Sequence, residues 1–114
     1  MKTNIKQVTS PKLTIAVITL NEAERIEQCL RSAAFADELI VVDSGSTDET
    51  QSIARRMGAQ VFEYTDWQGF GEQRNRLLEH STGEYIFFLD ADETISSALQ
   101  SEIETAIATA STDK

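Results

Sequence analysis

Short apolar runs alternate with helical patterns along this chain, and this alternation constrains the fold more than any other feature. The runs cover residues 13–20 (LTIAVITL), 39–42 (LIVV), 59–64 and 85–89 (YIFFL). The run at 13–20 is typical of a strand buried on both faces of a parallel sheet, and the run at 39–42 predicts a second buried strand. We expect the other two segments to be strands as well. Apolar residues at helical spacing separate the runs. The pattern predicts an α/β fold in which a mostly parallel sheet is covered by helices on both faces.

Two helices are expected to begin at capping boxes. Asn21 is followed three positions later by Glu24, and Ser46 is followed in the same way by Glu49. In such a box the first side chain bonds the amide of the residue three positions on, and the acid bonds back.

The order of the strands follows from their connections. Right-handed crossovers restrict the possible arrangements, and we predict the order 3-2-1-4, which reverses between the first and fourth strands. Ligands of such sheets bind beyond the carboxyl ends of the strands, at the point of reversal. Three polar segments directly follow strands there, namely Asn21-Glu22, Asp43-Ser44 and Asp90-Ala91-Asp92. We expect all three to face one crevice.

Length and charge narrow the class of protein. The 114 residues fit one domain, and we expect residues 1–12 to be a loose leader and residues 13–114 to form that domain. With 19 acidic against 10 basic side chains, the chain is not suited to bind nucleic acid or anionic lipid by bulk charge. No apolar run reaches the length of a membrane span. The single cysteine, Cys29, excludes an internal disulfide and makes a reducing, cytoplasmic compartment the default.

Asp90 and Asp92 are the main candidates for a chemical role. Two carboxylates separated by one residue at a strand end project to the same side, where they repel each other unless a cation joins them. A hard divalent cation such as Mg²⁺ or Mn²⁺ suits oxygen ligands and keeps open positions for substrate phosphates. The alternative is that these acids cap the following helix or lie in solvent.

Three other residues allow two interpretations each. Asp43 could accept hydrogen bonds from a sugar hydroxyl or a base, or could start a turn, and the two are compatible. Glu22 is favoured as an acid near a helix start rather than a ligand. Arg74 could bind a phosphate or a base, or could pair with Glu72 or Glu79 at the surface. For Trp67 and Phe70 the sequence does not decide between covering a ligand and anchoring their loop.

Several segments together resemble a known family. The segments LTIAVITLNEAERIEQCL, ELIVVDSGSTDET and GFGEQRNRLLEHSTGEYIFFLDADE occur in the order and approximate spacing of the nucleotide-sugar half of inverting family-two glycosyltransferases. They are most similar to the branch that builds lipopolysaccharide core oligosaccharide. The resemblance implies a glycosyltransferase type A fold, a Rossmann-like arrangement, that binds a UDP-sugar or similar donor together with a divalent cation.

The same resemblance assigns roles to residues. Leu20 and Glu22 would lie near the nucleoside, and Asp43 would recognise the uracil or the ribose. Many relatives carry a second Asp after the second strand, where this chain has Ser44.

The remaining roles concern the diphosphate and the sugar. Arg74 would contact the nucleotide and Asp90 the ribose or sugar. Asp92 would coordinate the metal on the pyrophosphate.

Family members continue well past the D-x-D segment, so we expect this chain to be a truncated donor-binding portion. The acceptor, a glycan or glycolipid, and the general base would then belong to the absent part, and these residues alone would bind donor weakly with little transferase activity. The resemblance also implies action at the cytoplasmic face of the inner membrane, through peripheral association of the whole protein.

Two other functions compete with this one. The segment FFLDADET also resembles the motif of haloacid-dehalogenase-like phosphatases, in which Asp90 would be the nucleophile and Asp92 the acid/base. That family places the motif on its first strand, whereas here it comes last. The third possibility is a non-catalytic, flavodoxin-like signalling module with an acidic crevice.

Overall fold

The sheet is parallel throughout and has the predicted order. The computed structural model describes residues 12–112, in which four strands pair in the order β3-β2-β1-β4. The strands are β1 (Leu13–Thr19), β2 (Glu38–Asp43), β3 (Gln60–Glu63) and β4 (Tyr85–Asp90). The helices are α1 (Ile26–Ser32), α2 (Thr50–Arg56), α3 (Phe70–His80) and α4 (Ser97–Thr112). The predicted α/β class and strand order are confirmed.

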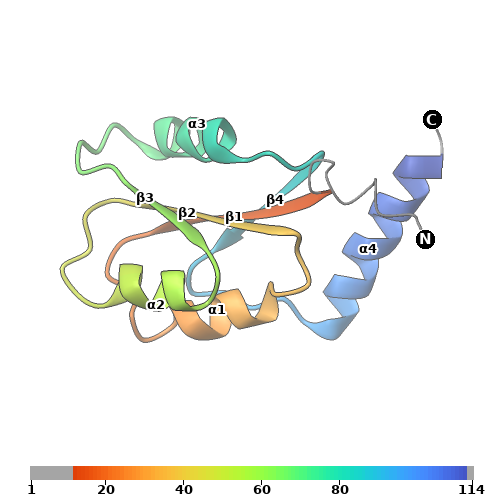
Figure 1. Cartoon of the computed structure of the whole chain (residues 1–114), viewed down its shortest axis with the longest axis horizontal. Coiled ribbons are helices and arrows are strands. Elements are labelled where there is room, and N and C mark those ends of the chain that lie inside the picture. Colours follow the sequence, from red (N-terminus) through yellow and green to blue (C-terminus); the bar gives the residue numbers. More distant parts are fainter. Residues whose placement is uncertain (1–11, 113–114) are drawn as a thin grey trace, which may run out of the picture.

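Helices cover both faces of the sheet, but unequally. In Figure 1, α1 and α2 lie on one face and α3 lies alone on the other. The larger core fills the α1–α2 side and includes Ile15, Val17 and Leu30, each at most 1% exposed. The smaller core under α3 consists of Ala16, Ile40, Val42 and Leu77. The sheet face under α3 is therefore the less covered one, and it is where an open cavity can form.

The last helix lies away from the carboxyl ends of the strands. Figure 1 shows α4 beside the opposite end of the sheet. Its residues Leu99, Ile103 and Ile107 are only partly buried against the larger core. Since α4 is remote from the strand ends that were expected to bind a ligand, it serves the fold rather than that rim.

Both expected capping boxes are wrong. Helix α1 begins at Ile26 and α2 at Thr50, and neither has a side-chain cap. Asn21 instead adopts a left-handed conformation with φ 54°, which Asn tolerates better than most residues. The Ser46 hydroxyl donates to Asp43, 2.6 Å away. Polar side chains in both loops bond across the rim of the sheet, and the helices begin several residues later.

The expected leader lies mostly outside the described residues, which begin at Lys12. Lys12 itself belongs to the fold, because its amide donates to Asp37 Oδ2 at 3.1 Å and its carbonyl accepts from the Tyr85 amide at 2.9 Å.

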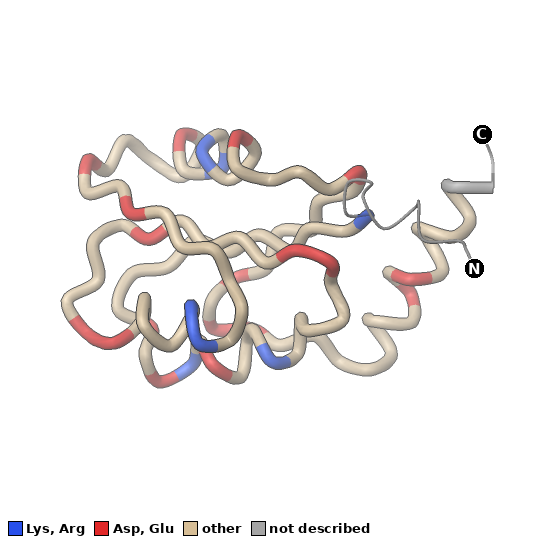
Figure 2. The backbone as a smooth tube through the Cα atoms, in the orientation of Figure 1, with Lys and Arg blue, Asp and Glu red and all other residues tan. Residues whose placement is uncertain are grey.

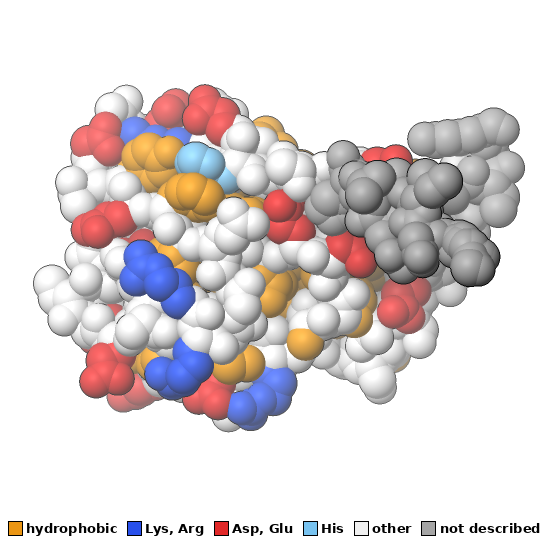
Figure 3. Space-filling model, in the orientation of Figure 1, with side chains coloured by type: hydrophobic (Ala, Val, Ile, Leu, Met, Phe, Trp, Pro, Cys, Tyr) orange, Lys and Arg blue, Asp and Glu red, His pale blue; other side chains and the backbone are white. Residues whose placement is uncertain are grey.

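The acidic side chains are distributed rather than gathered. Figure 2 shows Asp and Glu along most of the described chain, and the face in Figure 3 carries acidic and basic groups interspersed. Most of the negative charge therefore lies on the solvated surface.

Among the described residues, no helix has the length and apolar character needed to cross a membrane.

Candidate functional site

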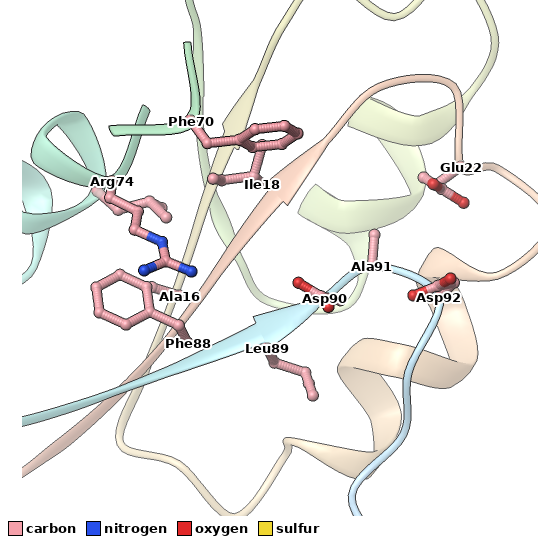
Figure 4. Close-up of a pocket in the computed structure, with 11 residues that line it drawn as sticks. Ala16, Ile18, Glu22, Phe70, Arg74, Phe88, Leu89, Asp90, Ala91 and Asp92 are labelled. Atoms are coloured by element: carbon pink, nitrogen blue, oxygen red, sulfur yellow. The ribbon is translucent and has the colours of Figure 1, made fainter. Parts of the chain in front are cut away.

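An open cavity of about 330 Å³ lies at the carboxyl ends of β1 and β4, below the start of α3. We call it the β1–β4 cavity. Its polar lining comes from Glu22, Arg74, Asp90 and Asp92, and Figure 4 shows these side chains around the same space. The point where the strand order reverses thus carries both positive and negative groups, as a charged ligand requires.

Asp90 and Asp92 face this cavity together. Asp90 is the last residue of β4 and is paired in register with Ile18 of β1. The intervening Ala91 is 5% exposed, whereas both aspartates are exposed. β4 ends at Asp90, and Ala91 and Asp92 lie in a turn in which the Glu93 amide donates to the Asp90 carbonyl at 2.9 Å. Both carboxylates line the cavity, and it is this turn that brings Asp92 there.

Arg74 enters the cavity from α3. Its guanidinium carbon lies 5.3 Å from the centre of the Phe88 ring, which is a cation–π geometry. Within residues 12–112, no carboxylate lies at ion-pair distance from it, and Glu72 instead lies 3.6 Å from Arg76 Nε. The alternative in which Arg74 pairs with Glu72 or Glu79 is therefore wrong, and its charge is available to an anion.

Glu22 lies in the loop before α1 rather than in the helix itself. Its carboxylate accepts from Arg25 at 3.2 Å, in a pair that is partly exposed. It lines the β1–β4 cavity and also an adjoining one, so it belongs to the rim and not only to the helix start.

The adjoining cavity has a volume of about 480 Å³ and is mainly apolar. Leu20, which is 52% exposed, forms part of its wall together with Ser44, Trp67 and Phe70. The rings of Trp67 and Phe70 meet edge to face with centres 4.9 Å apart. Phe70 borders both cavities, so a ligand that occupied both would pass beneath it.

Asp43 is the candidate that lines neither cavity. It is fully buried, and its carboxylate accepts five hydrogen bonds. The donors are the Thr19 hydroxyl, the amides of Gly45 and Ser46, the Ser46 hydroxyl and the Gln51 side chain. Burial alone would raise the pKa of Asp43, but the hydrogen bonds, foremost those from Ser46, outweigh it and lower the pKa. Asp43 thus organises its loop from within, and the turn interpretation holds.

That loop is bonded to the loop after β1. The Asn21 amide donates to Ser46 Oγ at 2.7 Å, and the Thr47 amide donates to Asn21 Oδ1 at 2.8 Å. The Glu22 amide donates to Thr50 Oγ1 at 2.8 Å. These contacts hold Glu22 at the rim. Sequence reasoning missed them, although the hydroxyl-rich segment after the second strand was a signal for such bonding.

The negative charges at this rim act on the buried thiol of Cys29. Burial, and then the charges of Asp92, Glu93, Asp90 and Glu22, raise the pKa of Cys29 to about 12. Four carboxylates are thus close enough to disfavour another negative charge.

No group of three or more His, Cys, Asp or Glu side chains within residues 12–112 forms a complete metal site. This is compatible with Mg²⁺ or Mn²⁺, which proteins often bind through one or two carboxylates while substrate phosphates and water complete the shell. The donor set of Asp90 and Asp92, both oxygen ligands and both open to the cavity, fits such an ion.

Comparison with known sequences identifies the family of this chain. The sequence model of the family "Glycosyl transferase family 2" matches residues 14–110. A protein from Rickettsia bellii named as an uncharacterized glycosyltransferase is 39% identical over 111 residues, which cover 96% of this chain and 37% of that protein. The glycosyltransferase SunS of Bacillus subtilis is 39% identical over 90 residues, or 76% of this chain and 21% of SunS.

Solved structures show the same fold. Staphylococcus aureus TarS (residues 1–349) superposes with a TM-score of 0.70 at 29% identity, over 86% of this chain and 32% of that one. Glucosyl-3-phosphoglycerate synthase from Mycobacterium tuberculosis, crystallised with Mn²⁺, UDP and glucosyl-3-phosphoglycerate, gives a TM-score of 0.64 at 30% identity, over 78% of this chain and 37% of that one.

This chain therefore spans about a third of the length of the first relatives that it matches. The fold is the α/β fold of type A glycosyltransferases. The family match covers every strand and most of the last helix. From its sequence, its fold and the rim of its sheet, we conclude that this chain belongs to glycosyl transferase family 2.

Proposed function

We propose that this chain is the donor-binding portion of an inverting glycosyltransferase and binds a nucleotide-sugar, with UDP as the nucleotide. The observation that carries the proposal is the meeting of Arg74 with Asp90 and Asp92 in one cavity of a family-two chain. The related synthase crystallised with UDP and Mn²⁺ supports the choice of nucleotide and ion.

The two cavities offer complementary surroundings to the parts of such a donor. Leu20 and Glu22 border the adjoining cavity, where the nucleoside would lie against apolar walls. Arg74 would donate hydrogen bonds to the diphosphate, since a guanidinium without a carboxylate partner favours a phosphate oxygen. Asp90 would accept from the hydroxyl groups of the ribose or the sugar. Asp43 supports the loop from inside and makes no direct contact in this proposal.

Asp92 would hold the divalent cation, Mg²⁺ or Mn²⁺, with Asp90 nearby. Such an ion, when bound, neutralises negative charge on the departing nucleoside diphosphate. Arg74 would also neutralise negative charge on the diphosphate, because its positive charge faces the cavity already in the absence of the donor. The chain thus contributes the leaving-group side of a displacement at the anomeric carbon.

The acceptor site and the general base are proposed to lie elsewhere in the whole protein, because this chain spans about a third of its relatives. The acceptor would be a glycan or glycolipid of the cell envelope, and lipopolysaccharide core is the class that the sequence motifs favour. A base would remove the proton from the acceptor hydroxyl as the bond to the sugar forms.

Titration of UDP into the 114-residue chain by calorimetry, with and without Mn²⁺, tests the proposal. We expect binding that Mn²⁺ strengthens, and weaker binding of ADP. In Asp92→Asn, which keeps the size of the side chain, the gain from Mn²⁺ should disappear. In Arg74→Met, UDP should bind more weakly while the Mn²⁺-dependent ratio of affinities persists.

Two results would contradict it. Equal affinity for UDP and ADP would remove the case for a uridine donor, and a Mn²⁺ effect that survives in Asp92→Asn would remove the assigned metal ligand.

No described feature favours the phosphatase, whose motif stands on the first strand, whereas this D-x-D begins at the last residue of β4. A signalling module would bind the cation without a preference for uridine nucleotides.

A further inference from the structure

Two polar side chains of α3 are buried without taking part in the assigned contacts. Gln73 is 0% exposed and Arg76 is 7% exposed. Arg76 Nη1 donates to Gln73 Oε1 at 2.6 Å, so the two form one unit on a single face of the helix. Burying a charge is costly, and a well-packed hydrophobic residue often stabilises a core as well or better. The pair therefore calls for a role other than filling the core.

Arg76 holds the loop between β3 and α3. Its Nη2 donates to Asp66 Oδ2 at 3.0 Å and its Nη1 to the Asp66 carbonyl at 3.4 Å. Its guanidinium carbon also lies 4.4 Å from the centre of the Tyr64 ring. Trp67 follows Asp66 directly and contacts Phe70. One side chain thus anchors the segment that carries this aromatic pair.

Gln73 extends the same unit to the loop after β2. A guanidinium has only donors, so the carbonyl oxygen of the Gln73 amide must face Arg76. The Gln73 NH₂ group then points the other way and donates to Ser44 Oγ at 3.0 Å. Ser44 lines the adjoining cavity, as do Trp67 and Phe70.

The unit therefore connects two walls of the cavity that adjoins the D-x-D site. One wall is Ser44, and the other is the exposed pair Trp67 and Phe70, which are 50% and 67% exposed. Trp67 lies in the loop before α3, and an exposed aromatic side chain in a loop has little packing of its own to fix it. The hydrogen bonds of Arg76 and Gln73 link Asp66, the residue before Trp67, to Ser44.

We propose that Arg76 and Gln73 are positioning residues of the donor site, which set the separation between Ser44 and the Trp67–Phe70 pair before the nucleotide binds. This inference rests on the proposed function, since the separation matters only if a nucleotide occupies that cavity. The walls are ordered in advance, so binding does not have to order them.

Arg76→Met tests this role, because Met can fill most of the space without the hydrogen bonds. Trp67 is the only tryptophan of the chain, so its emission reports on this loop. In the free variant we expect emission shifted to longer wavelength and stronger quenching by acrylamide. UDP affinity should fall about tenfold, since two side chains must then be ordered on binding.

Three further variants separate positioning from general stability. Arg56→Met removes an exposed arginine of α2 and should change neither emission nor affinity. Arg76→Lys keeps the charge without the planar fork and should recover only part of the affinity. In Gln73→Leu combined with Arg76→Met, the loss should be smaller than the sum of the single losses, because both act through one unit.

The Mn²⁺ dependence distinguishes the two proposals. The ratio of affinities with and without Mn²⁺ should be unchanged in Arg76→Met, because Asp92 lies in the other cavity. If the wild-type chain does not bind UDP, the proposed function fails and this inference fails with it. If the wild type binds UDP and Arg76→Met, still folded by circular dichroism, has the same affinity and the same Trp67 emission, the positioning role alone is wrong.

Discussion

Asp43→Asn is the perturbation whose effect can be worked out most fully from the structure. Three N–H donors converge on Asp43 Oδ2, namely Gly45 N at 2.9 Å, Ser46 N at 2.7 Å and Gln51 Nε2 at 2.8 Å. The hydroxyls of Thr19 and Ser46 bond Oδ1, and both can rotate to accept from the new amide. The neutral oxygen must still receive the three N–H groups.

The magnitude follows from the loss of charge at these bonds. A hydrogen bond to a charged group contributes roughly 1.5–3 kcal/mol and a neutral one roughly 0.5–1.5 kcal/mol, so three bonds lose about 3 kcal/mol together. A neutral amide costs less to bury than a carboxylate, which offsets part of this. We expect the free energy of unfolding to fall by about 2 kcal/mol.

Urea denaturation followed by circular dichroism measures this change. The unfolding midpoint should decrease by about 1–2 M. Asp92→Asn is the matched control, since Asp92 is exposed and its stability change should stay within about 0.5 kcal/mol. A loss below about 0.5 kcal/mol in Asp43→Asn would refute the role assigned to these bonds.

The pH dependence of the same pair of proteins provides a second check. Because folding lowers the pKa of Asp43, the stability that its ionised form contributes is present above the unfolded pKa of about 4 and is lost as pH falls through the folded pKa. The stability difference between wild type and Asp43→Asn should therefore be constant from pH 7 to about pH 5 and should shrink toward pH 3. An equal difference at pH 7 and pH 3 would show that charge is not its cause.

Two further outcomes test the packing of the fold. Gly83→Ala should destabilise the protein by about 2 kcal/mol or more, because a Cβ there would lie 2.5 Å from Thr14 Oγ1 and 2.8 Å from Thr14 N. Gly71→Ala, where a Cβ meets nothing within 4 Å, is the control and should not lower the stability; an increase of up to about 1 kcal/mol is expected, because alanine favours a helix over glycine. The Cys29 thiol, buried and with its pKa raised to about 12, should not react with Ellman's reagent at pH 8 until urea unfolds the chain. Rapid reaction of the native protein would show that the region around Cys29 opens readily.

The strands and the D-x-D pair could be predicted because the signals for them are local. A continuous apolar run predicts a buried strand by itself, and this holds for β1 and most of β2, whereas β3 and β4 are partly exposed. A period of two predicts that Asp90 and Asp92 face one side. Both carboxylates do line the cavity, but Asp92 lies in a turn after β4, so the strand period is not what brings it there. The order of the segments along the chain and the rule of right-handed crossovers then predicted the strand order, which the structure confirms.

The burial of the Asp43 carboxylate and its hydrogen-bond partners could not be predicted in this way. It ends β2 at the expected rim, but its carboxylate is bonded to Thr19 of the neighbouring strand, its partner in the register. Register is a property of two strands that meet in space, so it is absent from the local pattern. The same reason explains the failure of the capping boxes, because the Ser46 hydroxyl accepts from the Asn21 amide and the Asn21 side chain accepts from the Thr47 amide, each on the other loop.

Arg74 and Arg76 show the same division between the two sources of information. They lie two positions apart, so at about 100° per residue a helix directs them to widely different sides. The sequence thus separates their roles, but only packing against the sheet decides that Arg74 faces the cavity and Arg76 is buried against Asp66.

The sequence by itself determined the class of fold, the order of the strands, and the rim where acidic residues collect. These depend on periodicity and connectivity, which act between near neighbours along the chain. The tertiary structure alone decided which polar groups at that rim stay open to a ligand and which are consumed by internal hydrogen bonds. That choice depends on distances between loops remote in sequence, because a buried polar group must be satisfied by whichever partner the fold brings within reach.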